Sequence, residues 1–394
     1  MTASTLDTSA RTPLKGWLAV LAVTLGIFSL VTTEILPIGL LTPIGEDFRI
    51  TPGTAGLTMT LPGFLAALAA PAVTVAAGRL DRRILLCALM VVLALADVLA
   101  ATAQAYWAVL VSRVLVGLVI GAFWAIGSGL AARLVGPGHA GRATAVIFSA
   151  VPLGSVLGVP AGTFVGELFG WRAAFAALAL FTIGVIAALA WALPPLAPSA
   201  SAGATRLGVL RAMTRGRATR LGLLVTVLVV LAHFGTYTYV TPLLRQVTQV
   251  SPELITVFLL VYGTAGIVGN FAAGAAIARD LRLTFLTAAG LIGVATCALP
   301  LLGDSKAVTL ALLVIWGFAY GAVPVCSGTW FARAAPQAPE AASVLFTSSF
   351  QATLSAGALL GGFVVDAVSV PAVMVTGGVL ALLAVGVLSR ARSA

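Results

Sequence analysis

The sequence predicts an all-α polytopic membrane protein, with twelve transmembrane helices in two pseudo-symmetric six-helix bundles. Its composition, the length of its apolar runs and an internal repeat predict this fold class. Apolar residues make up 60% of the 394 residues and charged residues only 9%, whereas a typical soluble domain is about 25% charged. The apolar runs approach the ~20 residues that a membrane-spanning helix needs. They are continuous, unlike the short alternating segments of a transmembrane β-barrel.

The internal repeat relates residues 110–135 to residues 310–335, which read as two copies of one membrane helix. Identical pairs include Leu110/Leu310, Val114/Val314, Gly117/Gly317, Gly121/Gly321, Ala122/Ala322 and Arg133/Arg333. Self-similarity over half a chain is typical of a membrane protein built from two similar bundles. Arg113 corresponds to Leu313, so we expect any chemistry to lie where the two copies differ.

The twelve spans follow one another along the chain, and each ends where charged residues, proline or glycine interrupt an apolar run. In the first half we expect helices at 17–39, 52–76, 83–103, 106–132, 142–167 and 171–193. In the second half we expect 218–244, 253–277, 283–302, 307–332, 341–366 and 370–389. A stretch of small, proline and arginine residues separates the halves. The expected domains are therefore a bundle at 1–193, a cytoplasmic linker at 194–217 and a bundle at 218–394.

The positive charges are placed unevenly between the two sides of these spans. The net charge is +10, from 22 Lys and Arg against 12 Asp and Glu. With the N-terminus inside, Arg49, Arg172, Arg245 and Lys306 fall outside, Arg113 falls within a span, and all other cations fall inside. The positive-inside rule then predicts a multi-pass protein of the cell inner membrane with both termini cytoplasmic. The charge indicates contact with membrane lipid and not a nucleic-acid partner.

Three ionisable residues lie within the predicted spans, where each is a functional candidate because burying a charge in the membrane is costly. Glu34 lies about five residues from the outer end of its span, Asp97 about six, and Arg113 about seven. At this shared depth they can form a triad for proton coupling, with Glu34 as the leading proton carrier and Asp97 second. Burial favours the protonated form of a carboxyl, whereas a nearby guanidinium favours the charged form. The alternative is a static structural pair near the membrane surface.

Several uncharged polar and aromatic residues are candidates for substrate binding. His233 and Tyr237 share a helix face because they are four positions apart. The alternative for His233 is a neutral side chain that bonds a neighbouring hydroxyl. Asn270 and Gln351 can line a cavity or form hydrogen bonds between helices. The last two candidates are Phe123 and Trp124, for which packing is the alternative.

Small residues at four-residue spacing let helix backbones approach closely in lipid. The residues with this predicted packing role are Gly117, Gly121, Gly154, Gly158, Pro160 and Gly162.

The chain resembles the major facilitator superfamily, and within it the drug:proton antiporter branch with twelve spans. TTEILPIGLLTPIGEDF at 32–48 is similar to the first-helix signature of that branch. The turn GRLDRR, with Gly78, Asp81, Arg82 and Arg83, resembles a shortened form of the loop motif between spans two and three. Arg113, Gly117 and Gly121 match the fourth-helix motif. Gly154 to Gly162 resembles the antiporter motif of the fifth helix, with the proline one place later than usual.

The resemblance implies the major facilitator fold and a proton-coupled exporter that works by alternating access. The closest similarity is to bacterial sugar-efflux, arabinose-efflux, nucleoside-efflux and chloramphenicol-type exporters, which also suggests multidrug resistance. It implies an inner gate at Gly78, Asp81, Arg82 and Arg83, with Asp280 in the corresponding turn of the second half. The alternative for these charges is a purely topological role.

We therefore expect a monomeric secondary transporter that exchanges protons for small neutral or lipophilic molecules, drug-like or similar to sugars and nucleosides. The alternatives are an importer or symporter of a small metabolite and a non-transporting membrane receptor on the same fold. An enzyme is disfavoured because the chain has only two histidines, no HExxH and no phosphate-binding loop. No cofactor and no metal are expected.

Overall fold

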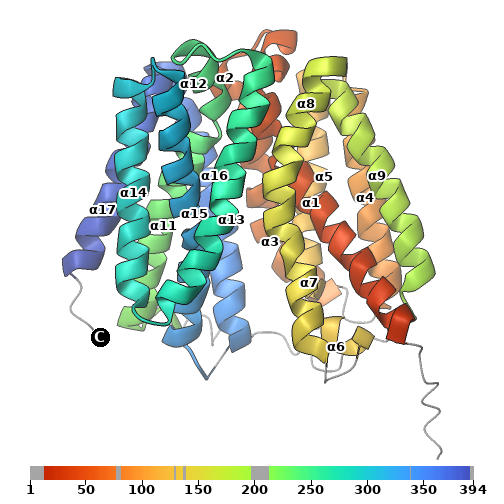
Figure 1. The fold of residues 1–394 in the computed structure, drawn as a ribbon. Coiled ribbons are helices and arrows are strands. Elements are labelled where there is room, and N and C mark those ends of the chain that lie inside the picture. Colours follow the sequence, from red (N-terminus) through yellow and green to blue (C-terminus); the bar gives the residue numbers. More distant parts are fainter. Residues whose placement is uncertain are drawn as a thin grey trace, which may run out of the picture.

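The computed structural model of the protein describes residues 13–76, 81–127, 130–135, 139–196, 213–337 and 339–390. Figure 1 shows two groups of helices side by side, with α1 and α3 to α9 in one group and α11 to α17 in the other. Eleven helices in the described ranges are long and apolar enough to cross a membrane. The helix α3 (Leu57–Ala76) contains 20 residues and no charge, and it takes the place of the second predicted span.

The helices of the first half match the predicted spans within a few residues, with one exception. They are α1 (Pro13–Phe48), α2 (Pro52–Ala55), α3, α4 (Arg82–Ala101), α5 (Tyr106–Gly127), α6 (Leu130–Val135), α7 (Ala140–Leu153), the π-helix η3 (Gly154–Gly158), α8 (Val159–Phe169) and α9 (Trp171–Ala192). The predicted end of the first span at residue 39 is wrong. α1 continues through Pro37 and Pro43 to Phe48, because surrounding helices can satisfy the backbone groups that a proline frees.

The helices of the second half also follow the prediction. They are α11 (Arg217–Tyr237), α12 (Val240–Gln246), α13 (Pro252–Ile277), α14 (Leu281–Leu302), α15 (Lys306–Ala334), α16 (Pro339–Ala367) and α17 (Val370–Arg390). One hydrophobic core lies almost wholly among these helices, and two others lie among α1 to α9. The predicted linker at 194–217 falls mainly on 197–212, outside the described residues, so the domain boundaries stay a prediction.

Two turns show that the halves repeat in backbone conformation as well as in sequence. Arg49 and Gln249 are the two non-glycine residues with positive φ in the described chain, at 53° and 52°. They stand 200 positions apart, and each is followed by a helix that begins with proline, at Pro52 and Pro252. The same unusual conformation at equivalent positions confirms the pseudo-symmetry that the sequence predicts.

The two ends of the molecule differ in how the bundles meet. We call the end that carries α2, α12 and the last turn of α1 the α2 end, and the opposite end, which carries α6, the α6 end (Figure 1). The bundles touch mainly through α16 against α2 and α3, α13 against α8 and η3, and α12 against α1. Arg49, Arg172, Arg245 and Lys306 all stand beside helix ends at the α2 end.

Candidate functional site

Asp97 of α4, Arg113 of α5 and Thr33 of α1 form a polar cluster inside the first bundle. All three are fully buried. The Thr33 hydroxyl donates to Asp97 Oδ2 at 3.1 Å, and Arg113 Nη1 donates to the Thr33 carbonyl at 2.7 Å. Arg113 Nη2 also donates to the Ser112 hydroxyl at 3.3 Å, and its guanidinium lies 5.2 Å from the Phe175 ring centroid. Thr33 therefore joins the two charged side chains, a role that the sequence did not indicate.

Glu34 points away from this cluster and towards the second bundle. Its Oε1 accepts a hydrogen bond of 2.8 Å from Gln351 Nε2 of α16. The side chain is 7% exposed, so the carboxyl is buried where the two bundles meet. Glu34 and Asp97 both interact electrostatically with Arg113, but none of its nitrogens lies within 4.0 Å of a carboxylate oxygen among the described residues. The predicted triad is thus a set of neighbouring groups joined through α1, without direct ion pairs.

The predicted depth of Glu34 needs correction, because α1 is longer than expected. Glu34 lies 14 residues before the end of α1, about 21 Å at ~1.5 Å per residue. Asp97 lies four residues before the end of α4, and Arg113 seven residues after the start of α5. Distances from helix ends therefore do not place the three residues on a common depth scale. The alternative of a pair near the membrane surface does not fit Glu34.

A second cluster consists of aromatic side chains in the second bundle. The His233 ring is stacked on Tyr320 with centroids 3.3 Å apart, and on Tyr237 at 5.2 Å. Trp316 Nε1 donates to His233 Nδ1 at 3.1 Å. An accepting Nδ1 implies that the proton of this imidazole sits on Nε2. Tyr262 stacks on Tyr237 at 4.6 Å, and its buried hydroxyl has no hydrogen-bond partner among the described residues.

His233 and Tyr237 therefore share a face as predicted, but the partner of His233 is an indole and not the hydroxyl of the alternative. Trp316 and Tyr320 were not among the residues predicted from the sequence. The sequence did contain a signal for Trp316 and Tyr320. They are positions at which the two copies of the repeat differ, since the equivalent residues of the first half are the aliphatic Val116 and Ile120.

The other predicted substrate-binding residues are not brought together. Asn270 Nδ2 donates to the Gly321 carbonyl of α15 at 3.2 Å, which is the helix–helix hydrogen bond of the alternative. Phe123 is 1% exposed and packs in the core of the first bundle. The side chain of Trp124 lies outside the described part of the chain. Gln351 alone of this group reaches the ionisable residues. Substrate binding by these residues stays a prediction.

The small residues of the fourth and fifth spans lie at close helix contacts. A Cβ atom built on Gly117 would lie 2.4 Å from the Pro62 carbonyl of α3, and one on Gly158 would lie 2.6 Å from Thr32 Oγ1 of α1. Gly154 and Gly162 face Val31 and Leu36 of the same helix. Gly121 and Pro160 are also buried. This arrangement brings the π-helix η3 against the stretch of α1 that carries Thr33 and Glu34.

The residues of the predicted inner gate act within their own bundles. Asp81 caps α4 by accepting from Arg83 N at 2.7 Å, and its other oxygen accepts from Leu196 N at 2.9 Å. Arg83 donates to the Ala190 carbonyl near the end of α9. In the second half Asp280 caps α14, and Arg282 donates to the Leu388 carbonyl at 2.6 Å.

These contacts match between the halves, although none of them joins the two bundles. Arg82 is buried and its backbone N–H donates to the Leu196 carbonyl at 2.9 Å. Gly78 lies outside the described residues. The gating role of these residues stays a prediction.

At the α2 end, polar contacts do join the bundles. Asp366 at the end of α16 accepts from the Thr51 hydroxyl at 2.6 Å and from the Gly53 N–H at 2.8 Å. The Thr241 hydroxyl donates to the Ile38 carbonyl at 2.9 Å. Arg245 and Glu46 form an ion pair of 3.3 Å between bundles. Hydrogen bonds and an ion pair therefore hold the two bundles together at this end.

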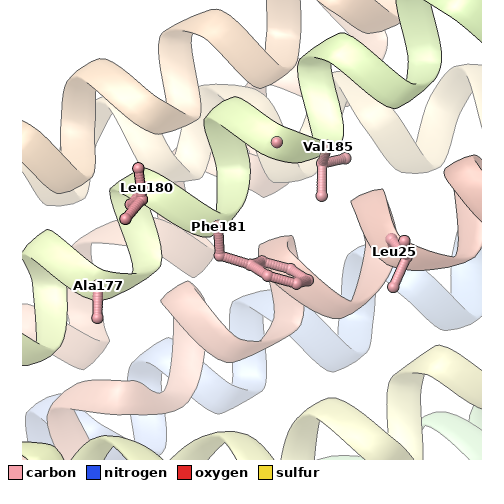
Figure 2. Close-up of a pocket in the computed structure, with 6 residues that line it drawn as sticks. Leu25, Ala177, Leu180, Phe181 and Val185 are labelled. Atoms are coloured by element: carbon pink, nitrogen blue, oxygen red, sulfur yellow. The ribbon is translucent and has the colours of Figure 1, made fainter.

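One shallow pocket on the described surface lies away from these residues. It has a volume of about 400 Å³, lies between α1 and α9, and is lined by apolar side chains that include Leu25, Leu180 and Phe181. Figure 2 shows only carbon on the labelled side chains. Leu180 is 71% exposed, so this groove belongs to the surface that faces lipid. In the described part of the chain, no three His, Cys, Asp or Glu are grouped to hold a metal ion.

Two helical bundles, with ionisable groups buried inside one of them and a buried carboxyl where they meet, are typical of one class of protein, the secondary membrane transporters. Residues 21–352 match the Major Facilitator Superfamily, and the chain belongs to this family. It is a multi-pass membrane transporter and not an enzyme.

Two curated relatives span nearly the whole chain. The chain is 34% identical over 373 residues to the transcription regulatory protein OpdE of Pseudomonas aeruginosa. This alignment covers 93% of this chain and 92% of OpdE. It is 30% identical over 367 residues to the purine ribonucleoside efflux pump NepI of Escherichia coli K12, again covering 93% and 92%.

Solved structures agree on the fold. The nucleoside transporter NupG superposes with a TM-score of 0.78 at 10% identity, over 94% of this chain and 99% of NupG. A bacterial homologue of the human lysosomal transporter Spinster has a TM-score of 0.75 at 17% identity, over 96% and 97%.

Proposed function

We propose that this chain is a proton-coupled exporter of small neutral or lipophilic molecules, with Glu34 as the leading proton carrier. The carrying observation is the hydrogen bond of 2.8 Å from Gln351 to the buried Glu34 carboxyl, which joins the two bundles. A bundle that rocks against its neighbour must change this contact. When Gln351 withdraws, the carboxylate loses a donor that favours its charged form, so proton binding and bundle movement are linked.

The proposed direction of transport and the proposed orientation of the protein in the membrane rest on separate observations. The relative NepI is named an efflux pump, and the motifs of the fifth span resemble those of antiporters. Among the described residues, most Lys and Arg lie near helix ends on the side of the α6 end, which supports a cytoplasmic position for that end and for both termini. The contacts of Asp366 and Arg245 then close the outer side, leaving the site to be loaded from the cytoplasm.

The substrate class follows from the aromatic cluster and from the relatives. The rings of His233, Tyr237, Tyr262 and Tyr320 stack on one another, and a planar substrate ring would have to join this stack or replace one of its contacts. Few cations lie in the spans, which disfavours a polyanion. A nucleoside or a neutral aromatic drug fits this chemistry best.

Transport by everted membrane vesicles tests the proposal. Vesicles with an imposed proton gradient are given labelled inosine, a purine ribonucleoside, or chloramphenicol, a neutral drug. We expect gradient-driven uptake by the native protein and its loss in Glu34→Gln, while substrate counterflow without a gradient persists. Asp304→Asn, an exposed acid in the turn before α15, is the matched control. Full gradient-driven uptake by the Glu34→Gln variant would contradict the assignment.

A further inference from the structure

The backbone carbonyl of Thr33 has no helical donor. In an α-helix the carbonyl of residue i accepts from the N–H of residue i+4. Four positions after Thr33 stands Pro37, which lies inside α1 and carries no N–H. Arg113 Nη1 donates to this carbonyl instead, at 2.7 Å. The proline therefore creates the acceptor that holds the buried guanidinium.

The side chain of the same residue holds the acid. The Thr33 hydroxyl donates to Asp97 Oδ2 at 3.1 Å, and Thr33 is completely buried. One residue of α1 thus fixes Arg113 through its backbone and Asp97 through its side chain.

The contact with the Thr33 carbonyl keeps Arg113 from forming a direct ion pair with Asp97. No Arg113 nitrogen lies within 4.0 Å of an Asp97 oxygen. Asp97 Oδ1 and Arg113 Nε are buried without a hydrogen-bond partner in the described part of the chain. A direct pair would keep the carboxylate charged, whereas a separated one leaves the carboxyl free to bind a proton.

Few other charges act on Asp97. Glu34 follows Thr33 on α1 but bonds Gln351 of α16. On α9 the sole ionisable side chain is Arg172 in its first turn, where it pairs with Asp47 at 2.8 Å. On α4 itself, the other titratable groups are in its first two turns. Arg113 is therefore the charge whose position decides the charge of Asp97.

We propose that Thr33 is a positioning residue of the proton-coupled cycle. Its Pro37-freed carbonyl holds Arg113 away from Asp97, while its hydroxyl donates to the Asp97 carboxylate, so the two contacts together set how readily Asp97 binds and releases a proton. This inference rests on the proposed function. The proton adds to the Asp97 carboxylate to give the acid and leaves in the reverse step. Thr33 is adjacent to Glu34, so movement of α1 at the bundle contact is transmitted directly to the Asp97 and Arg113 pair.

Infrared difference spectroscopy of the purified full chain during a pH titration tests this without a substrate. The carboxyl C=O band that disappears in Asp97→Asn reports the protonated acid. Thr33→Val removes a donor to the carboxylate, so we expect the midpoint of this band to move about one unit towards higher pH. Thr33→Ser keeps the hydroxyl and should titrate like the native protein.

Pro37→Ala tests the contact between Arg113 and the Thr33 carbonyl, and it should move the titration midpoint in the direction opposite to Thr33→Val. It gives the Thr33 carbonyl its ordinary helical donor, which releases Arg113 towards Asp97, so the midpoint should move towards lower pH. Pro43→Ala on the same helix is the control and should leave the midpoint unchanged. If Thr33→Val does not fold, Pro37→Ala and Thr33→Ser still decide the outcome.

Midpoints that stay unchanged in folded Thr33→Val or Pro37→Ala, or the absence of a band that depends on Asp97, overturn the inference. The band reports Asp97 and not Glu34, because it is the band that disappears in Asp97→Asn. A native protein without gradient-driven transport but with the expected shifts would reject the proposed function and leave the Thr33 geometry standing.

Discussion

Trp316 supplies the buried hydrogen bond of His233 from 83 positions away along the chain. His233 is 1% exposed, and an imidazole nitrogen buried at this depth needs a partner. The indole ring also contacts Tyr237 and Tyr262 edge-on. One N–H group therefore orients the imidazole, while ring stacking holds the rest of the cluster in place.

Trp316→Phe should keep the ring packing and remove the N–H donor. We expect a loss of stability on the order of 1 kcal/mol, typical of a single hydrogen bond inside a membrane protein. The measurement is thermal unfolding in detergent, with Trp191→Phe as control because Trp191 is 74% exposed. Equal melting temperatures for both variants would show that the indole N–H does not stabilise the fold.

Residue-scale prediction from the sequence identified buried ionisable side chains where a residue type is unusual for its surroundings, while their role in proton coupling stays a prediction. Glu34, Asp97 and Arg113 were found because charges are rare in apolar spans. Thr33 was missed because threonine is common in such helices and its role depends on which helices surround it. Gln351 was found as a polar residue at depth, but its partner Glu34 could not be known from spacing.

The helix from α7 through η3 to α8 is the element that sets the position of α1. Its π-turn at Gly154–Gly158 stands just before Pro160, and π-turns are frequent at functional sites. Gly154, Gly158 and Gly162 bring the backbone against Val31, Thr32 and Leu36. Side chains at these positions would push this helix away from the stretch of α1 that carries Thr33 and Glu34.

Gly158→Ala should destabilise the protein and lower transport. A Cβ atom there would lie 2.6 Å from Thr32 Oγ1 and 3.0 Å from Thr32 Cβ, and overpacking of this kind costs about 1–3 kcal/mol. Gly184→Ala in α9 is the matched control, since a Cβ atom at Gly184 would have no neighbour within 4 Å among the described residues. Thermal unfolding and inosine uptake are measured together. A Gly158→Ala variant as stable and active as Gly184→Ala would refute the close-contact role.

At the scale of the whole molecule, the described contacts between bundles are strongest at the α2 end. The Asp366 carboxylate binds the first turn of α2, where free N–H groups favour an anion. Arg245 and Glu46 add an ion pair between the bundles at the same end. The proposed alternating-access cycle requires these contacts to break each time the α2 end opens.

Asp366→Ala should raise the population of molecules open at the α2 end about two- to fivefold, because charge-assisted contacts at an exposed site contribute up to ~1 kcal/mol. Spin labels at Gln104→Cys and Ser305→Cys in a background without other cysteines would report this as a larger share of long distances. Asp47→Ala is the control, since it removes an ion pair at the same end but within one bundle. Identical distance distributions in the two variants would exclude a closing role for Asp366.

The sequence by itself determined the helical class, the spans, the repeat and the few charges inside the membrane. Each of these depends on composition or on short-range order along the chain, since hydrocarbon requires long apolar helices and makes every embedded charge conspicuous. Only the tertiary structure decided that Glu34 meets Gln351 and that Thr33 separates Asp97 from Arg113. It also decided how far α1 continues past its prolines. These features depend on which helix faces lie together in space, and no local pattern encodes the rotation of one helix against another.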